Sequence, residues 1–149
     1  MNLVCLFLQQ VILTSFKYIN CHLNATPHLH GMDGMDDKVV TYSDMKRLVN
    51  DRNALIIDVR EVKEVKETGL IENSINIPLS LLRSALTSPK NEFKRTYQRE
   101  APNENTLLVF TCKSGNRALK ALHEAESLGF KKCRYYKGSW NEWSQKKGS

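Results

Sequence analysis

The sequence lacks the patterns that assign a chain to a membrane-spanning, nucleic-acid-binding or repeat class. Its most apolar stretch, residues 3–13, is shorter than the roughly 20 residues that a membrane-spanning helix needs. Basic residues do not occur in long runs and are interleaved with acidic ones, so the net charge of +6 favours a solvated surface with one local anion site over nucleic-acid binding. No internal repeat or low-complexity stretch is present, and the 149 residues have room for one domain with a tail.

The cysteines are few, and their spacing excludes the common cysteine-based sites. Cys5, Cys21, Cys112 and Cys133 match neither a zinc-binding pattern nor a Cys-x-x-Cys redox pair. A domain of this size does not need disulfide bonds, so a disulfide scaffold is also disfavoured. We therefore expect no metal and no cofactor, and we interpret Cys133 as a strand residue.

The amino-terminal segment differs from the rest, because residues 1–31 contain no acidic and only one basic residue. Residues 3–13 have the length of a signal-peptide core, but no basic residue precedes them and no small-x-small cleavage site follows. A mitochondrial presequence would contain arginines, and translation starting at Met32 or Met35 is a third interpretation. We expect residues 1–35 to be a poorly ordered tail or targeting segment of a cytoplasmic or mitochondrial protein, with a secretory route as the alternative.

The pattern of an alternating α/β domain begins at residue 36 and continues to residue 149. Residues 54–59 and 107–111 are continuous apolar runs, as expected for strands that are buried on both faces. Shorter strands are predicted at 39–41, 75–77 and 134–136, and helices after Ser43, at 61–67, after Ser80, at 93–97, at 116–128 and after Gly138. This order predicts an α/β fold, with a small, mostly parallel five-stranded sheet covered by helices on both faces.

Ligands bind to such sheets where strand ends meet helix starts, and Cys112 directly follows the strand at 107–111. Gly115 can adopt a positive φ angle, which lets successive backbone N–H groups point to one spot. The helix that begins near Asn116 adds its positive dipole end there, and Lys113 adds a cation. These features favour the thiolate form of Cys112 and predict that it is a nucleophile.

Arg117 lies in the first turn of that helix, where a cation opposes the helix dipole. Its presence there suggests that it binds an anion delivered to Cys112. The only histidine after residue 35, His123, lies roughly 10 Å along the helix axis from the helix start. That distance excludes the Cys–His pair of a cysteine protease, and we expect His123 to be an exposed helical residue.

The spacing of Cys112 and Arg117 separates two kinds of anion chemistry. Cysteine phosphatases hold phosphate in a longer loop, with one more residue between the cysteine and the arginine. Here only residues 113–116 intervene. This shorter loop is better matched to a sulfur atom on the cysteine than to a tetrahedral phosphoryl group. The spacing therefore favours sulfur transfer, with a phosphatase or arsenate-reducing enzyme as the less favoured alternative.

Residues 38–147 resemble a single-domain rhodanese. The matching motifs are Cys112-x-x-Gly115-x-Arg117, Asp58-Val59-Arg60-Glu61 with Glu64, Gly69-x-Ile71 with Ser74-Ile75-Asn76-Ile77-Pro78, and Tyr136-Lys137-Gly138-Ser139-Trp140. The sequence departs from the family pattern at Leu70, where many members carry His, and at Ser139, where many carry Gly. The closing segment is similar to thiosulfate sulfurtransferase-like and heat-shock-type rhodanese proteins.

The resemblance implies a ping-pong sulfurtransferase, in which Cys112 takes a sulfur from thiosulfate or another small anionic donor. The resulting persulfide would then pass its sulfur to cyanide or a thiol. We expect the amides of residues 113–117 to stabilise the persulfide, and Lys113 and Arg117 to attract the sulfonate. Ser114 either donates a hydrogen bond or faces water, and Gly115 and Asn116 complete the predicted binding loop.

Two further expectations concern the neighbouring strand end and the acceptor. Asp58 and Arg60 are expected to form an ion pair that ties their loop to the site, with a direct substrate role as the alternative. The alternative function is a persulfide carrier that delivers sulfur to a protein partner.

Overall fold

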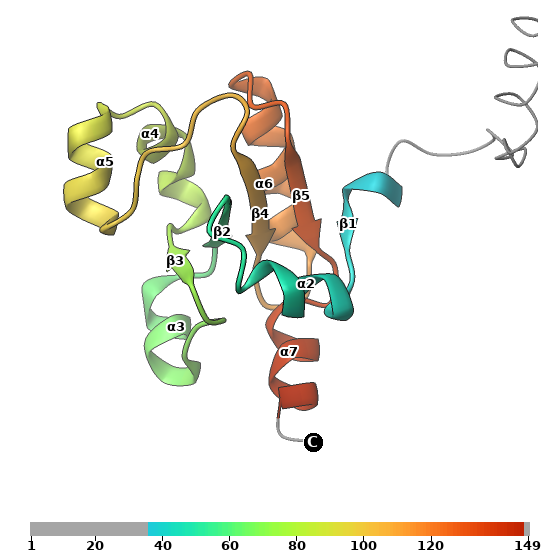
Figure 1. Ribbon diagram of the computed structural model, residues 1–149. Helices are drawn as coiled ribbons and strands as arrows, with labels where there is room; N and C mark the ends of the chain where they lie inside the picture. The colour runs from blue at the N-terminus through green and yellow to red at the C-terminus, as the bar shows by residue number, and fades with distance from the viewer. Residues whose placement is uncertain (1–35, 148–149) are drawn as a thin grey trace, which may run out of the picture. The chain divides into compact units, whose positions relative to one another are not determined.

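The structure is a computed structural model that describes residues 36–147 (Figure 1). Its elements, in chain order, are η1 (Asp36–Lys38, a 3₁₀ turn), β1 (Val39–Val40), α2 (Tyr42–Leu48), β2 (Ala54–Asp58), α3 (Val62–Thr68), β3 (Ser74–Asn76), η2 (Leu79–Leu81), α4 (Leu82–Leu86), α5 (Lys90–Tyr97), β4 (Leu107–Thr111), α6 (Asn116–Ser127), β5 (Cys133–Tyr136) and α7 (Ser139–Lys147). The predicted tail or targeting segment, residues 1–35, lies outside the described residues. Between residues 36 and 147, no helix combines the length and apolar character needed to cross a membrane.

The five described strands form one sheet in the order β1-β5-β4-β2-β3, and every neighbouring pair is parallel. The two continuous apolar runs of the sequence are the central strands β2 and β4, whose register pairs Ile57 with Phe110 and Asp58 with Thr111. Parallel strands need helical crossovers, which cover both faces of the sheet and account for the unbroken hydrophobic pattern. The predicted α/β class is confirmed, and the described sheet is parallel throughout.

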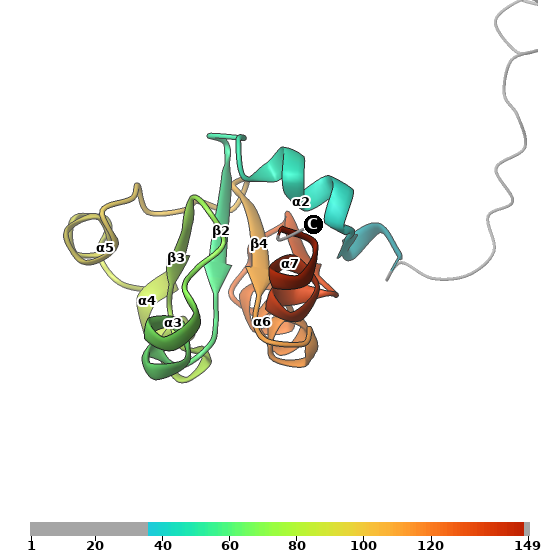
Figure 2. The ribbon, with the colours of Figure 1, turned by 90° about the horizontal axis from the view of Figure 1, so that it is seen from below.

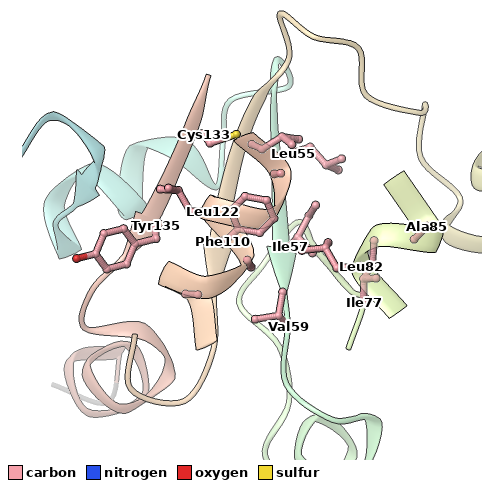
Figure 3. Close-up of a cluster of buried hydrophobic side chains, with 14 of the residues drawn as sticks. Leu55, Ile57, Val59, Ile77, Leu82, Ala85, Phe110, Leu122, Cys133 and Tyr135 are labelled. Carbon is pink, nitrogen blue, oxygen red and sulfur yellow. The ribbon is translucent and has the colours of Figure 1, made fainter. Parts of the chain in front are cut away.

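The core has two layers, one on each face of the sheet. Figure 2 shows helices on both sides of the strands, with α2 and α6 on opposite sides. Alternate residues of β2 and β4 point to opposite faces. Ile57 and Phe110 pack against α6 through Leu122 on one face (Figure 3), whereas Ile56 and Val109 belong to the cluster on the other face. The first layer also contains buried residues of α4 and α5, and the second contains buried residues of α2 and α7.

Three predicted helix starts were wrong, and one of them is that of α5, which begins at Lys90 rather than at Phe93. The cap of α2 is Thr41, not Ser43, because Thr41 and Asp44 form a reciprocal capping box: Thr41 Oγ1 accepts a hydrogen bond from Asp44 N–H (3.3 Å), and Asp44 Oδ2 accepts one from Thr41 N–H (3.1 Å). Ser80 lies inside η2, and the turn begins after Pro78, whose restricted φ suits a helix start.

Candidate active site: the Cys112 loop

The loop that follows β4 lies at the carboxyl edge of the parallel sheet, next to the ends of β2 and β5. The arrows of β4 and β5 point toward the end of the domain where α7 lies (Figure 1). Cys112 leaves the sheet one residue after β4, and Asp58 ends β2 in register with Thr111. The sheet therefore places the Cys112 loop and the segment after Asp58 side by side, as expected for a site in a parallel α/β fold.

Cys112 is fully buried, and its sulfur is held by a backbone amide. Gly115 N–H donates a hydrogen bond to Cys112 Sγ over 3.1 Å. Gly115 has φ = 93°, which confirms the predicted positive angle. A Cβ atom at this position would lie 2.4 Å from the carbonyl oxygen of Lys137, so the loop needs glycine both for its backbone conformation and for its packing against the turn before α7.

The amino end of α7 holds the other side of the loop. Trp140 N–H donates to the carbonyl oxygen of Cys112 (2.9 Å), and Asn141 N–H donates to that of Lys113 (3.0 Å). The buried hydroxyl of Ser139 accepts a hydrogen bond from Cys112 N–H at 3.1 Å. Unsatisfied amides at a helix start are normally capped by side chains or water. Here the Cys112 loop itself satisfies two of them.

The remaining predicted loop residues do not converge on the sulfur. The side chains of Lys113, Ser114 and Asn116 are exposed. Within residues 36–147, these three side chains form no hydrogen bond or ion pair with the rest of the protein. Gly115 supplies the one loop amide that donates to Cys112 Sγ among the described hydrogen bonds. The structure thus brings Cys112 and Gly115 together and leaves the other three side chains at the surface of the loop.

Arg117 forms a two-point ion pair with Glu64 of α3. Its Nη1 donates to Glu64 Oε2 (2.6 Å) and its Nη2 to Glu64 Oε1 (2.8 Å), with both side chains about one-third exposed. The hydrogen bonds from Arg117 lower the pKa of Glu64 to about 2, against the opposing effect of burial, and the same bonds raise the pKa of Arg117. Because a guanidinium has five N–H groups, the two bonds to Glu64 leave others of Arg117 unoccupied by that carboxylate.

Glu64 was not among the predicted site residues, although it belongs to one of the motifs that resemble the rhodanese family. It lies 53 positions before Arg117 in the sequence. Its placement in the first turn of α3, where Glu61 N–H donates to Glu64 Oε2 (3.0 Å), is readable from sequence as a helix-start pattern. Its contact with Arg117 depends on how α3 and α6 meet across the sheet edge, for which the sequence offers no local signal.

The Glu64–Arg117 pair predicts a specific dependence of stability on pH. Because the pKa of Glu64 is depressed in the folded state, its stabilisation is full above about pH 4.5 and is lost as the pH falls toward 2. Between pH 5 and pH 2.5 we expect wild type to lose about 1–2 kcal/mol more unfolding free energy than Glu64→Gln, after allowance for solvent screening.

Urea unfolding at the two pH values measures this difference. Glu67→Gln is the matched control, because Glu67 lies on the same helix, is exposed, and has no described partner. Equal pH dependence in wild type and Glu64→Gln would contradict the strength assigned to this pair.

Asp58 and Arg60 form the predicted ion pair, with both side chains 1% exposed. Arg60 Nη2 donates to Asp58 Oδ2 (2.7 Å) and to the carbonyl oxygen of Gly69 (2.8 Å), and Arg60 Nη1 donates to Thr68 Oγ1 (2.8 Å). The guanidinium also lies 4.7 Å from the ring centroid of Trp140. A pair buried in this way ties α3 to the sheet edge and leaves almost no surface for a substrate.

The positions of two further residues exclude them from the chemistry of the loop. His123 is exposed on α6, with Nδ1 3.7 Å from Glu126 Oε2, as expected for a surface histidine. Cys133 begins β5, as predicted, and burial raises the pKa of its thiol to about 11. Of the two cysteines in residues 36–147, only Cys112 accepts a hydrogen bond from a backbone amide.

Three surface depressions among the described residues lie at the opposite edge of the sheet. One of about 650 Å³ is lined by residues 52–55, at the start of β2, and by residues 98–103 and 105–106 before β4. Because the strands are parallel, this edge is remote from their carboxyl ends.

Comparison with known proteins places this loop in a family. Residues 41–146 match the rhodanese-like domain. The chain is 44% identical over 110 residues to a rhodanese domain-containing protein of Drosophila melanogaster, which covers 74% of this chain and 99% of the fly protein. It is 37% identical over 108 residues to the human thiosulfate:glutathione sulfurtransferase, over 72% of this chain and 93% of the human protein.

A solved structure gives the same result for the fold. The single-domain sulfurtransferase RDL2 of Saccharomyces cerevisiae superposes with a TM-score of 0.66 at 36% identity, over 74% of this chain and 91% of the yeast chain. In sequence this yeast protein carries the name thiosulfate sulfurtransferase RDL2, mitochondrial. These comparisons confirm sulfur transfer as the predicted class of reaction. The chain belongs to the family of rhodanese-like domains.

Proposed function

We propose that the protein moves a sulfane sulfur from thiosulfate, or a similar small anionic donor, through a persulfide on Cys112 to a thiol acceptor. The observation that carries this proposal is the 3.1 Å hydrogen bond from Gly115 N–H to Cys112 Sγ. A preorganised amide aimed at the sulfur favours a negative charge there, without a histidine base. The short spacing to Arg117 supports sulfur chemistry over phosphate chemistry.

In the first half-reaction the Cys112 thiolate attacks the outer sulfur of thiosulfate. A new S–S bond forms while the bond between the outer sulfur and the sulfonate sulfur breaks, and its electron pair leaves with sulfite. Cys112 then carries a persulfide anion, so that charge balances without proton transfer. In the second half-reaction the acceptor thiol gives its proton to the persulfide, the resulting thiolate attacks the outer sulfur, and Cys112 departs as a thiolate.

The other loop residues bind the small anionic sulfur donor and do not contact the sulfur of Cys112. Lys113 is exposed beside the loop, and Arg117 keeps N–H groups that Glu64 does not occupy, so both attract the sulfonate. Ser114 and Asn116 provide polar groups at the exposed rim. Asp58 and Arg60 have a supporting role, because they fix the neighbouring segment from a buried position.

A small thiol is the acceptor that the comparisons support best, because the human relative is named for glutathione. Cyanide and a cysteine of a protein partner use the same Cys112 persulfide and differ only in the second half-reaction. Steady-state kinetics with thiosulfate and each acceptor in turn distinguish them.

We expect parallel lines in double-reciprocal plots for thiosulfate and glutathione, with sulfite release as the readout. Absence of sulfite release with glutathione, cyanide and dithiothreitol would contradict the proposed activity. Orthovanadate-sensitive release of phosphate from an aryl phosphate would instead support a phosphatase.

The proposed domain division assigns the activity to residues 36–149 and treats residues 1–35 as a tail or targeting segment. A mitochondrial location accords with the name of the yeast relative, and a cytoplasmic location is the alternative. Mass spectrometry of the native amino terminus in fractionated cells tests both points. A mature chain that is cleaved near residue 31 and secreted would contradict the proposed location.

A further inference from the structure

Ser139 contacts the nucleophilic residue more closely than its place in the sequence suggests. It lies 27 positions after Cys112, begins α7 and has no exposed surface. Its Oγ lies 3.1 Å from Cys112 N, 2.7 Å from the carbonyl oxygen of Tyr136 and 3.8 Å from Cys112 Sγ. The hydroxyl therefore accepts from the amide of Cys112, and its single hydrogen has two acceptors to choose from.

The backbone around Ser139 is arranged to keep the hydroxyl in this position. Ser139 has φ = 50°, an angle that residues other than glycine rarely adopt. The two residues after it, Trp140 and Asn141, donate to the carbonyl oxygens of Cys112 and Lys113. In trans peptides, the N–H points opposite to the carbonyl. The carbonyl of Cys112 shares a peptide unit with the N–H of Lys113, and the carbonyl of Lys113 shares one with the N–H of Ser114. Because both carbonyls point toward the amino end of α7, both of these N–H groups point away from it.

We propose that Ser139 is a positioning residue for sulfur transfer, whose hydroxyl follows the charge on Cys112. When Cys112 Sγ is bonded to a second sulfur and carries little charge, the hydroxyl donates to the carbonyl oxygen of Tyr136, 2.7 Å away. When Cys112 is a thiolate, the hydroxyl donates to Sγ beside the amide of Gly115. The inference rests on the persulfide mechanism proposed above.

The thiolate appears twice in that mechanism, as the attacking group of the first half-reaction and as the leaving group of the second. Hydrogen bonds to charged groups are stronger than those to neutral ones. The Ser139 hydroxyl therefore favours the anionic form of Cys112 that the first half-reaction requires, and in the second half-reaction it lowers the barrier by stabilising the departing thiolate. Ser139 is buried behind the loop, while the sulfonate of the donor binds from the exposed side. The hydroxyl should therefore affect kcat and leave the KM for thiosulfate unchanged.

Ser139→Ala and Ser139→Gly test this role together. Both remove the hydroxyl, but glycine adopts φ = 50° without strain and alanine does not. We expect both variants to lower kcat by about tenfold and to change the KM for thiosulfate by less than about twofold. Single-turnover rates should fall for persulfide formation from thiosulfate and for sulfur loss to glutathione. Ser144→Ala is the control, because Ser144 lies exposed on the same helix and its Oγ donates to the carbonyl oxygen of Asn141 (3.3 Å).

The outcomes separate the possible roles. Wild-type kinetics in Ser139→Gly with slow turnover in Ser139→Ala would show a purely backbone role and overturn the proposal. A raised KM with unchanged kcat would overturn it as well, because it would mean direct binding of the donor. If wild type itself acquires no sulfur from thiosulfate, the proposed function fails. If wild type acquires sulfur and both variants match it, only the role of Ser139 fails.

Discussion

Replacing Cys112 by serine is expected to lower kcat for sulfur transfer by at least about a thousandfold, while the fold is retained. The hydroxyl of serine is un-ionised at neutral pH and cannot form the S–S bond on which the reaction depends. The substitution is small, and the serine oxygen can still accept the hydrogen bond from Gly115 N–H. Turnover with thiosulfate and glutathione measures the loss, and circular dichroism checks the fold.

Cys133→Ser is the matched control for this substitution. Cys133 is also a buried free cysteine, but it lies at the start of β5, away from the loop, and burial raises the pKa of its thiol. We expect Cys133→Ser to keep a kcat within about twofold of wild type once its lower stability is allowed for. Comparable losses in the two variants would mean that activity follows core packing rather than a specific nucleophile.

Gly115→Ala is the second substitution with a large expected effect. The added Cβ would meet the carbonyl oxygen of Lys137 at 2.4 Å, and this neighbour is backbone that cannot rotate away. The loop must shift, which moves Gly115 N–H away from Cys112 Sγ. A displacement near 1 Å can cost about a hundredfold in rate, so we expect kcat to fall by about that factor. Steady-state kinetics on folded protein measure the effect.

Gly129→Ala separates this clash from the cost of the backbone angle. Gly129 has φ = 94°, close to the 93° of Gly115, but nothing lies within 4 Å of a Cβ built there. Alanine at either position adopts an unfavourable φ, which destabilises the fold by about 1–2 kcal/mol. We expect Gly129→Ala to lose stability and keep kcat. A hundredfold loss of kcat in both variants would show that destabilisation alone impairs turnover.

The sequence predicts the fold well where one physical signal dominates. The continuous apolar runs at 54–59 and 107–111 predict strands that are buried on both faces, and in the structure they form the central strands β2 and β4. The start of α2 was placed wrongly because Thr41 and Ser43 are both good caps. The choice depends on the reciprocal bond to Asp44, which the single-residue preference does not include.

The candidate site is predictable to the extent that it is contiguous. Cys112 and Gly115 lie three positions apart, and the strand-loop-helix pattern around them predicts their arrangement. Glu64 and Ser139 lie 53 and 27 positions from their partners, and the sheet order brings them to the loop. Their contacts depend on how helices pack at the carboxyl edge of the sheet. Local spacing carries no information about that packing.

The most direct test of the central claim is the mass of the protein after incubation with thiosulfate and removal of excess donor under non-reducing conditions. The persulfide mechanism predicts a gain of one sulfur atom, located by peptide mapping on the fragment that contains Cys112, and its loss on addition of glutathione. No gain in mass, or a gain that persists in Cys112→Ser, would contradict sulfur transfer through Cys112.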